Sequence, residues 1–329
     1  MLSPVEQMIF VLLALFSLGA AFVGFREMYL IINRGEGRLH LDRLPARLWR
    51  ALVVYIGQPT TLRARRVTSL LHLGVVWGFT FYFLVNFGDV LQGFIPGFTF
   101  LEGSGLIYDG YRLLADVLSV AVLVGVAYFI VRRLALPSRV ELQYHDNVLL
   151  HPRVRERAVL TDSMIVAVFI LLHVGARFLG EAVLVAQHGP DLLMPFATLV
   201  SPLFAGFSPD TLALLRHVFW WVALGGILLF MPYFPYTKHA HLFMAPLNYL
   251  TRPERTSLGE MEPVDLEDDE REQFGVTRLE HLSKTQIFDA FACIMCNRCQ
   301  DVCPARALTS ARWATSRCWT SSTSAARRC

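Results

Sequence analysis

The sequence predicts an all-α membrane protein, in which a bundle of five transmembrane helices is followed by a short cysteine-rich segment. Three observations support this. Hydrophobic residues make up 54% of the 329 positions and charged residues only 17%, a balance untypical of soluble domains. Five apolar runs are long enough to cross a bilayer. Four of the six cysteines fall within residues 293–303.

The five apolar runs should each form a membrane-spanning helix, because backbone groups in lipid find no other hydrogen-bond partners. Each run can cross the roughly 30 Å of hydrocarbon. The first run carries Glu6 and lacks a basic leading region, so we interpret it as a retained helix rather than a signal peptide. The runs are Val5–Ile32, Val67–Ile95, Leu113–Leu134, Leu160–Ala186 and Thr211–Phe234.

The distribution of arginine predicts the orientation of the bundle. The loops after the first and third runs are rich in arginine, whereas residues 96–111 and 187–210 contain no Lys or Arg. Basic loops stay in the cytoplasm, so the N-terminus should lie outside and everything after residue 236 inside. The net charge is only +3 and indicates no nucleic-acid partner; the expected surroundings are the lipid bilayer.

The composition changes after the last run and divides the chain into domains. We expect a membrane domain over residues 1–250, an acidic linker over 251–275 and a cysteine segment over 276–305. Within that segment, apolar residues recur at helical spacing between Val276 and Phe291. Residues 306–329 form an atypical tail.

The cysteine segment contains the stretch "CIMCNRCQDVCP", which has the spacing C-x2-C-x2-C-x3-C-P. This run is typical of ferredoxins, where its thiolates bind a [4Fe-4S] cluster. Zinc sites more often use two separated ligand pairs. We therefore expect an incomplete ferredoxin-like segment with four candidate metal ligands: Cys293, Cys296, Cys299 and Cys303.

The tail offers no second cysteine run for a neighbouring cluster. In two-cluster ferredoxins the fourth cysteine, here Cys303, binds the other cluster. The 24 residues 306–329 are rich in Arg, Ser and Thr, lack acids and fit neither a helix nor a strand pattern. We interpret them as the product of a truncated or frameshifted gene, with a genuine disordered basic tail as the alternative.

Histidines near the cytoplasmic end of the bundle suggest a haem site. His72 lies about 8 Å inside the second run, at about 1.5 Å per residue, and His239 and His241 follow the fifth. The two runs are antiparallel, so these side chains occupy similar depths. Intramembrane histidines commonly serve as axial ligands. Four basic residues stand at the same level and suit haem propionates: Lys238, Arg63, Arg65 and Arg66.

A second histidine pair lies nearer the outer face. His173 and His217 fall at similar depths and could bind a second haem, although packing or a quinone contact is equally compatible with their positions. His173, Arg177 and Glu181 recur every fourth residue, which places Arg177 and Glu181 to pair. This stripe is either a structural ion pair inside the bundle or part of a proton or quinol path.

Two stretches resemble known redox families. "PYTKHAHLFMAPLNYL" after the fifth run resembles the nitrate reductase gamma-subunit type of cytochrome b. "FGVTRLEHLSKTQIFDAFACIMCNRCQDVCPA" is similar to fused membrane iron-sulfur oxidoreductases related to heterodisulfide reductase subunits E and D. The resemblance covers about residues 1–305. Members of that family carry a second cysteine motif and a cysteine-rich catalytic domain downstream, and this chain shows neither.

The resemblance implies a multi-pass protein of the prokaryotic inner (cytoplasmic) membrane. A cytoplasmic donor, in some members electron-transfer flavoprotein, would pass electrons through cubane clusters to b haems and menaquinone. It supports His72 and His241 as the inner haem pair and the four motif cysteines as cluster ligands. The relatives carry further histidines where this chain has Tyr82 and Ala223. The resemblance therefore does not support a conventional outer haem in this chain.

Two other function classes remain open from the sequence. One is a transporter that carries a cluster as a redox sensor, which predicts inverted repeats or helices broken at the midplane. The other is an anchoring subunit without redox activity, which predicts a cluster but no membrane cofactor. No residue has the pattern of an acid-base or nucleophilic catalyst, so electron transfer is the leading hypothesis.

Overall fold

The computed structural model describes residues 2–136, 158–254, 267, 276–294 and 296. Within these ranges every regular element is helical, and the sole extended pairing is an isolated bridge between Glu36 and Ser283. Five helices are long and apolar enough to cross a membrane, which confirms the predicted all-α membrane bundle. They are α1 (Pro4–Ile32), α4 (Arg66–Phe94), α5 (Leu106–Leu134), α6 (Val159–His188) and the composite span Pro209–Phe230.

The composite span differs from the predicted run in its interior and its end. It consists of α8 (Pro209–Trp220), a π-helical turn (Trp221–Gly225) and α9 (Gly226–Phe230). The predicted run extended to Phe234, but residues 234–236 and 238–240 form short 3-10 turns. The apolar composition continues past the helix because these turns are themselves buried.

The remaining boundaries lie within a residue or two of the predicted ones, except at the start of α5. That helix begins at Leu106 rather than Leu113, because its first turns are amphipathic and carry Asp109 and Arg112. A prediction from hydropathy alone leaves such turns out of the helix because they contain charged residues, although their backbone is helical.

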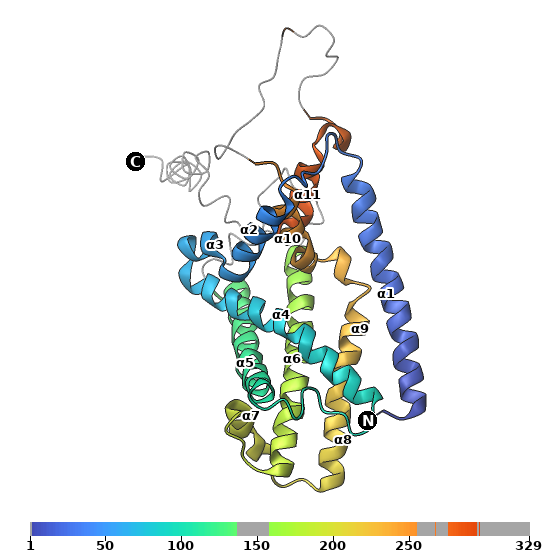
Figure 1. The fold of residues 1–329 in the computed structure, drawn as a ribbon, viewed down its shortest axis with the longest axis vertical. Coiled ribbons are helices and arrows are strands. Elements are labelled where there is room, and N and C mark those ends of the chain that lie inside the picture. The colour runs from blue at the N-terminus through green and yellow to red at the C-terminus, as the bar shows by residue number, and fades with distance from the viewer. Residues whose placement is uncertain (1, 137–157, 255–266, 268–275, 295, 297–329) are drawn as a thin grey trace, which may run out of the picture.

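Helix α6 occupies the middle of the bundle, where it packs against α5 on one side and α8 on the other (Figure 1). Helix α4 crosses the bundle obliquely and packs along α5, whereas α1 lies at the edge and contacts α9. The main core joins buried residues of α4, α5, α6 and α9, among them Val85, Val122, Val174 and Phe230. Side chains on α1 that face outward are largely apolar, as expected for a helix that borders lipid.

Helices α4 and α5 approach closely because glycines lie at their crossing. A Cβ atom built on Gly125 would lie 2.7 Å from Val75 Cγ2 and 2.9 Å from the Leu71 carbonyl oxygen, both on α4. A Cβ on Gly78 would likewise overlap the Val122 side chain. Small residues at a membrane-helix crossing allow such close backbone packing.

Shorter helices gather at one end of the bundle, which we call the α10 end (Figure 1). They are α2 (Leu44–Gly57), α3 (Pro59–Ala64), α10 (His241–Thr251) and α11 (Lys284–Ala292). The buried Arg47 links α2 to the end of α10: its guanidinium donates to the carbonyl oxygens of Asp42 and Arg252 at 2.6 Å each. Helix α7 (Pro195–Val200) lies at the opposite end.

Helix α11 confirms the helical pattern expected before the cysteines. Its N-terminus is closed by a capping box, in which the Ser283 side chain accepts from the Gln286 amide and the Gln286 side chain accepts from the Ser283 amide. The helix ends at Ala292, directly before Cys293.

Candidate redox site

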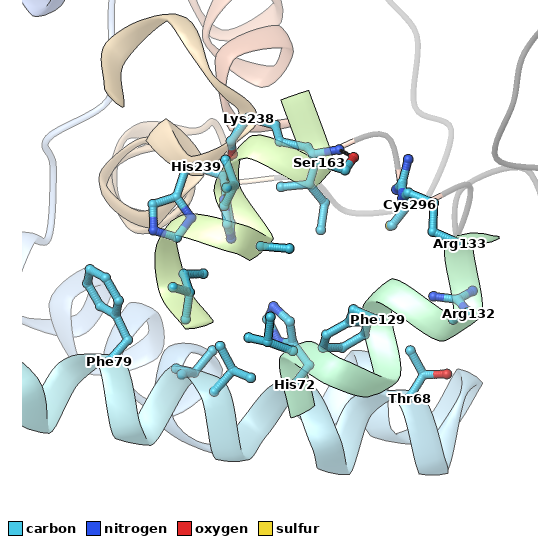
Figure 2. Close-up of a pocket in the computed structure, with 18 of the residues that line it drawn as sticks. Thr68, His72, Phe79, Phe129, Arg132, Arg133, Ser163, Lys238, His239 and Cys296 are labelled. Atoms are coloured by element: carbon cyan, nitrogen blue, oxygen red, sulfur yellow. Dashed lines mark hydrogen bonds between the residues drawn. The ribbon is translucent and has the colours of Figure 1, made fainter. Parts of the chain in front are cut away.

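A cavity of about 280 Å³ opens at the α10 end between α4, α5, α6 and the segment that joins α9 to α10. Figure 2 shows His72 on α4 across the cavity from Lys238 and His239. Its walls are mainly apolar and include Val76, Val126 and Ile170. Such a lining with a few converging polar groups is typical of a cofactor or ligand site.

His72 is held by a residue outside its own helix. Its Nδ1 lies 3.0 Å from Oε1 of Gln58, at the junction of α2 and α3. The amide oxygen can only accept, so Nδ1 carries the proton and Nε2 keeps its lone pair. Phe129 packs edge-on against the ring. His72 is thus fixed in the tautomer that binds a metal through Nε2.

His241 is arranged in the same way at the start of α10. Its Nδ1 lies 2.7 Å from the carbonyl oxygen of Lys238, which again leaves the Nε2 lone pair available. Burial lowers the pKa of His241 to about 4, and the neighbouring positive charges of His72 and Lys238 lower it further, against the effect of the bond to the carbonyl. The imidazole is therefore neutral near pH 7, the form that ligates metals.

His239 lies deeper in the wall, with 8% of its surface exposed. Its ring is surrounded edge-on by Phe79, Phe230 and Phe234, and by His241 at 6.1 Å. Among the described residues its Nε2 has no hydrogen-bond partner. Burial, followed by the charge of His241, lowers the pKa of His239 to about 3, so this ring is also neutral.

The donor chemistry of these three histidines suits a metal cofactor such as a haem. His72 and His241 come from separate elements, and each has its Nδ1 proton bound to a fixed oxygen acceptor. That second interaction is the usual support of a metal-bound histidine. The buried Nε2 of His239 is a further donor atom without a partner in the described structure. The structure thus brings the three predicted inner histidines to one cavity.

Basic residues surround the mouth of the same cavity. Lys238 contacts the side chain of Ser163 and donates to the Val159 carbonyl oxygen at 3.2 Å. Burial, followed by the charge of Arg133, lowers the pKa of Lys238 to about 8. Three arginines complete the basic lining: Arg65, Arg132 and Arg133. Guanidinium and ammonium groups in this position suit carboxylates or phosphates of a bound group.

The cysteine segment reaches this mouth. Ile294 and Cys296 line the cavity, and Nη1 of Arg65 donates to the carbonyl oxygen of Cys296 at 2.9 Å. Cys293 is exposed at the end of α11. The other two predicted ligands, Cys299 and Cys303, lie outside the described residues, as do the tail 306–329 and most of the linker. Cys296 is therefore the motif cysteine that lines the same cavity as the histidines.

His217 of the predicted outer pair contacts α1. Its Nε2 lies 2.6 Å from Oε1 of Glu6, a carboxylate that also caps α1 through Ser3 and accepts from the indole of Trp221. The ring nitrogen that could bind a haem thus has a protein partner.

His173 has different partners from His217. Its Nδ1 lies 3.0 Å from the carbonyl oxygen of Ala223, in the π-helical turn, and its ring stacks on Phe169. Tyr82 packs edge-on against it and bonds Ser119 at 2.7 Å. His173 and His217 thus contact different partners, the Ala223 carbonyl oxygen and the Glu6 carboxylate.

The ionisable stripe contains the expected pair and one member that the sequence did not suggest. Arg177 lies 3.0 Å from Oε1 of Glu181, which confirms that pair, and 3.1 Å from Oδ2 of Asp89 on α4. The Arg177 side chain is 9% exposed. These groups border a small cavity of about 70 Å³ with Arg216 and Trp220. Asp89 was detectable as the sole acid within the second apolar run.

Comparisons with known proteins agree with the prediction that the cysteine segment binds a [4Fe-4S] cluster. A model of the 4Fe-4S binding domain matches residues 287–309. The chain is 25% identical over 307 residues to a probable iron-sulfur-binding oxidoreductase FadF of Bacillus subtilis, covering 88% of this chain and 40% of that protein. It is 26% identical over 314 residues to an EtfAB:quinone oxidoreductase of Syntrophomonas wolfei, covering 92% of this chain and 41% of that protein. No solved structure matches the chain significantly.

The chain carries a 4Fe-4S binding domain after five candidate membrane helices, and it is similar to iron-sulfur oxidoreductases. It spans about two fifths of the length of the curated relatives it matches.

Proposed function

We propose that this chain is the membrane part of an oxidoreductase that transfers electrons between a cytoplasmic donor protein and the menaquinone pool. A [4Fe-4S] cluster and one b haem would be the intermediate carriers. The observation that carries this proposal is the single cavity whose lining includes His72, His241 and Cys296. Candidate ligands for both carriers meet there, which a non-redox anchor or a transporter would not require.

The cluster would be held by Cys293, Cys296 and Cys299, with Cys303 as the fourth motif cysteine. The match of a 4Fe-4S binding domain over residues 287–309 supports this assignment, because all four lie inside the matched stretch. In two-cluster ferredoxins the fourth cysteine binds a neighbouring cluster, so Cys303 is the candidate link to a second centre.

The haem would be held by His72 and His241, with His239 as the alternative to His241. When bound, it would accept and release one electron at a time. Gln58 and the Lys238 carbonyl orient the two imidazoles. The apolar wall of Val76, Val126 and Ile170 excludes water, and the basic mouth can pair with the propionates. His173 and His217 have other partners, and we do not assign a second haem to them.

The partners follow from the relatives. One of them is named for oxidation of EtfAB by quinone, which supports electron-transfer flavoprotein as donor and a quinone as acceptor here; menaquinone is the specific expectation. The basic loops support a cytoplasmic position for the α10 end. The histidine arrangement supports the resemblance to the nitrate reductase gamma type, and the fused cysteine segment supports the one to heterodisulfide reductase subunits.

Absorption spectroscopy of membranes that contain the full chain tests the proposal. The reduced-minus-oxidised difference spectrum should show a b-type band, and His72→Ala or His241→Ala should abolish it. His188→Ala is the matched control, because this exposed histidine bonds to the Leu184 carbonyl oxygen of its own helix. A band that survives both cavity substitutions would contradict the haem assignment. Non-haem iron and acid-labile sulfide should be present and should disappear when the four motif cysteines are replaced by serine.

A further inference from the structure

The segment that carries the cysteines is fastened to the bundle before it reaches the redox cavity. Its first contact is the turn after α1, residues 34–37. The Glu36 amide donates to the Leu282 carbonyl oxygen at 2.9 Å, and the Lys284 amide donates to the Glu36 carbonyl oxygen at 3.0 Å. An ion pair between Arg34 and Glu280 lies beside them. The two backbone hydrogen bonds run directly between main-chain groups that are far apart in sequence. No flexible side chain forms part of either bond.

This close approach requires glycine at position 35. A Cβ atom on Gly35 would lie 2.7 Å from Ile287 Cδ1, 2.8 Å from the Leu282 carbonyl oxygen and 2.9 Å from the Lys284 nitrogen. Two of these atoms belong to backbone, and Ile287 is 3% exposed. None of them can move aside unless α11 itself shifts, because packed interiors have little free volume.

The second contact is α10. Nδ2 of the buried Asn248 donates to Oδ1 of Asp289 at 2.6 Å. Ile287 and Phe288 of α11 join the same core cluster as Met28 of α1 and Met244 of α10. Helix α11 is therefore packed into the bundle, not merely tethered to it.

Beyond α11 the chain turns to the cavity, where a third contact holds it. Arg65 belongs to the junction of α3 and α4, lines the cavity and donates to the carbonyl oxygen of Cys296. The bond is made to backbone, so it holds the main chain at Cys296 rather than the Cys296 thiol.

We propose that Gly35 and Arg65 are positioning residues for electron transfer between the cluster and the cofactor of the His72–His241 cavity. Gly35 seats α11 against the turn 34–37, and Arg65 holds the Cys296 backbone at the cavity mouth. In the step they support, the reduced cluster loses one electron and the oxidised cofactor gains it, while no bond forms or breaks. This inference rests on the proposed function.

The test compares Gly35→Ala with Gly19→Ala in the full chain in membranes. Gly19 also lies in the α1 region, and a Cβ there meets no atom within 4 Å. We expect both variants to retain iron, sulfide and haem. Rapid-mixing measurement of haem reduction through the cluster should show a several-fold lower rate in Gly35→Ala alone. Arg65→Leu should lower it as well, and Arg65→Lys should restore part of the loss.

Hydrogen exchange gives a readout that does not depend on electron transfer. Loss of a backbone hydrogen bond in Gly35→Ala should speed amide exchange at Glu36 and Lys284 about fivefold. Unchanged exchange would overturn the seating of α11, and faster exchange with an unchanged electron-transfer rate would overturn the positioning role. A wild-type chain without b haem would contradict the proposed function, while the exchange comparison would still decide whether Gly35 seats α11. Should Gly35→Ala fail to fold, the Arg65 variants decide the positioning role.

Discussion

Nδ1 of His72 lies 3.0 Å from Oε1 of Gln58, a residue with left-handed backbone (φ 44°) at the junction of α2 and α3. The junction is fixed by its own hydrogen bonds, since the amides of Thr61 and Leu62 both donate to the Gln58 carbonyl oxygen. The short helices at the α10 end therefore reach into the bundle and orient one of its candidate haem ligands.

Replacement of Gln58 should weaken the hold on the cofactor. In Gln58→Leu the Nδ1 proton of His72 loses its acceptor, and loss of such a partner typically costs about 10- to 100-fold in metal affinity. We expect haem retention, measured during competition with an external haem-binding protein, to fall by this factor. Gln58→Glu keeps an acceptor oxygen and should retain most of the affinity; equal losses in both variants would contradict the orienting role.

His239→Phe should show whether His241 or His239 binds the haem at the α10 end. The ring of His239 is enclosed by phenylalanines and has a buried Nε2 without a partner in the described structure. If His241 is the ligand, phenylalanine at position 239 removes an unsatisfied polar atom, which should stabilise the chain by about 1–3 kcal/mol and leave the b-type band intact. Thermal unfolding and the difference spectrum measure the two effects. Loss of the band would assign the ligand to His239.

Arg177→Met should destabilise the bundle strongly. The substitution leaves Asp89 and Glu181 as uncompensated charges away from water, and removal of one partner of a buried pair typically costs about 3–5 kcal/mol. Thermal unfolding in detergent measures this loss. Arg216→Met, at the same small cavity, should have a much smaller effect. Neutralising the whole group, as in Asp89→Asn, Arg177→Met and Glu181→Gln together, should recover most of the stability; no recovery would show that packing rather than charge dominates.

The packing of α2 should depend on pH through Asp42. Its carboxylate lies 3.1 Å from Nη2 of Arg47, and this hydrogen bond lowers the pKa of Asp42 below its ordinary 3.8. A lowered pKa means that the contribution is present above about pH 3.8 and is lost as the pH falls through the lower folded value. Fluorine NMR of fluorotryptophan at Trp49, on α2, should show the helix loosening in acid. Asp42→Asn should remove this pH dependence, whereas its persistence would assign it to another group.

The five spans were predictable because lipid leaves a backbone no alternative to the helix. Their ends matched where apolar composition ended with the helix, as at Ile32 of α1. The π-helical turn at Trp221–Gly225 was not predictable, because its reason is tertiary: it presents the Ala223 carbonyl to His173. Helix α2 had a detectable signal in the spacing of Leu48, Leu52 and Ile56, which the arginine-rich composition of that loop obscured.

The candidate site was predictable in its residue types and only partly in its contacts. Depth along antiparallel helices was enough to bring His72 and His241 to one cavity. The contact of His217 with Glu6 on the neighbouring helix α1 was not predictable, because no local pattern encodes a contact between residues 211 positions apart. The bond between Arg65 and Cys296 is of the same kind.

The close crossing of α4 and α5 at Gly78 and Gly125 affects the energetics of electron transfer at the cavity. The Leu71 carbonyl, which Gly125 approaches so closely, belongs to the peptide unit that connects Leu71 to His72. The backbone next to this candidate ligand is therefore packed tightly against α5, which restricts its movement when the charge at the cavity changes. Stiff surroundings keep the reorganisation of the protein small, and a small reorganisation lowers the barrier for an electron equally in both directions. With such a crossing, the cofactor of the cavity would pass electrons in either direction. The relative reduction potentials of the donor and the quinone would set the direction of electron transfer.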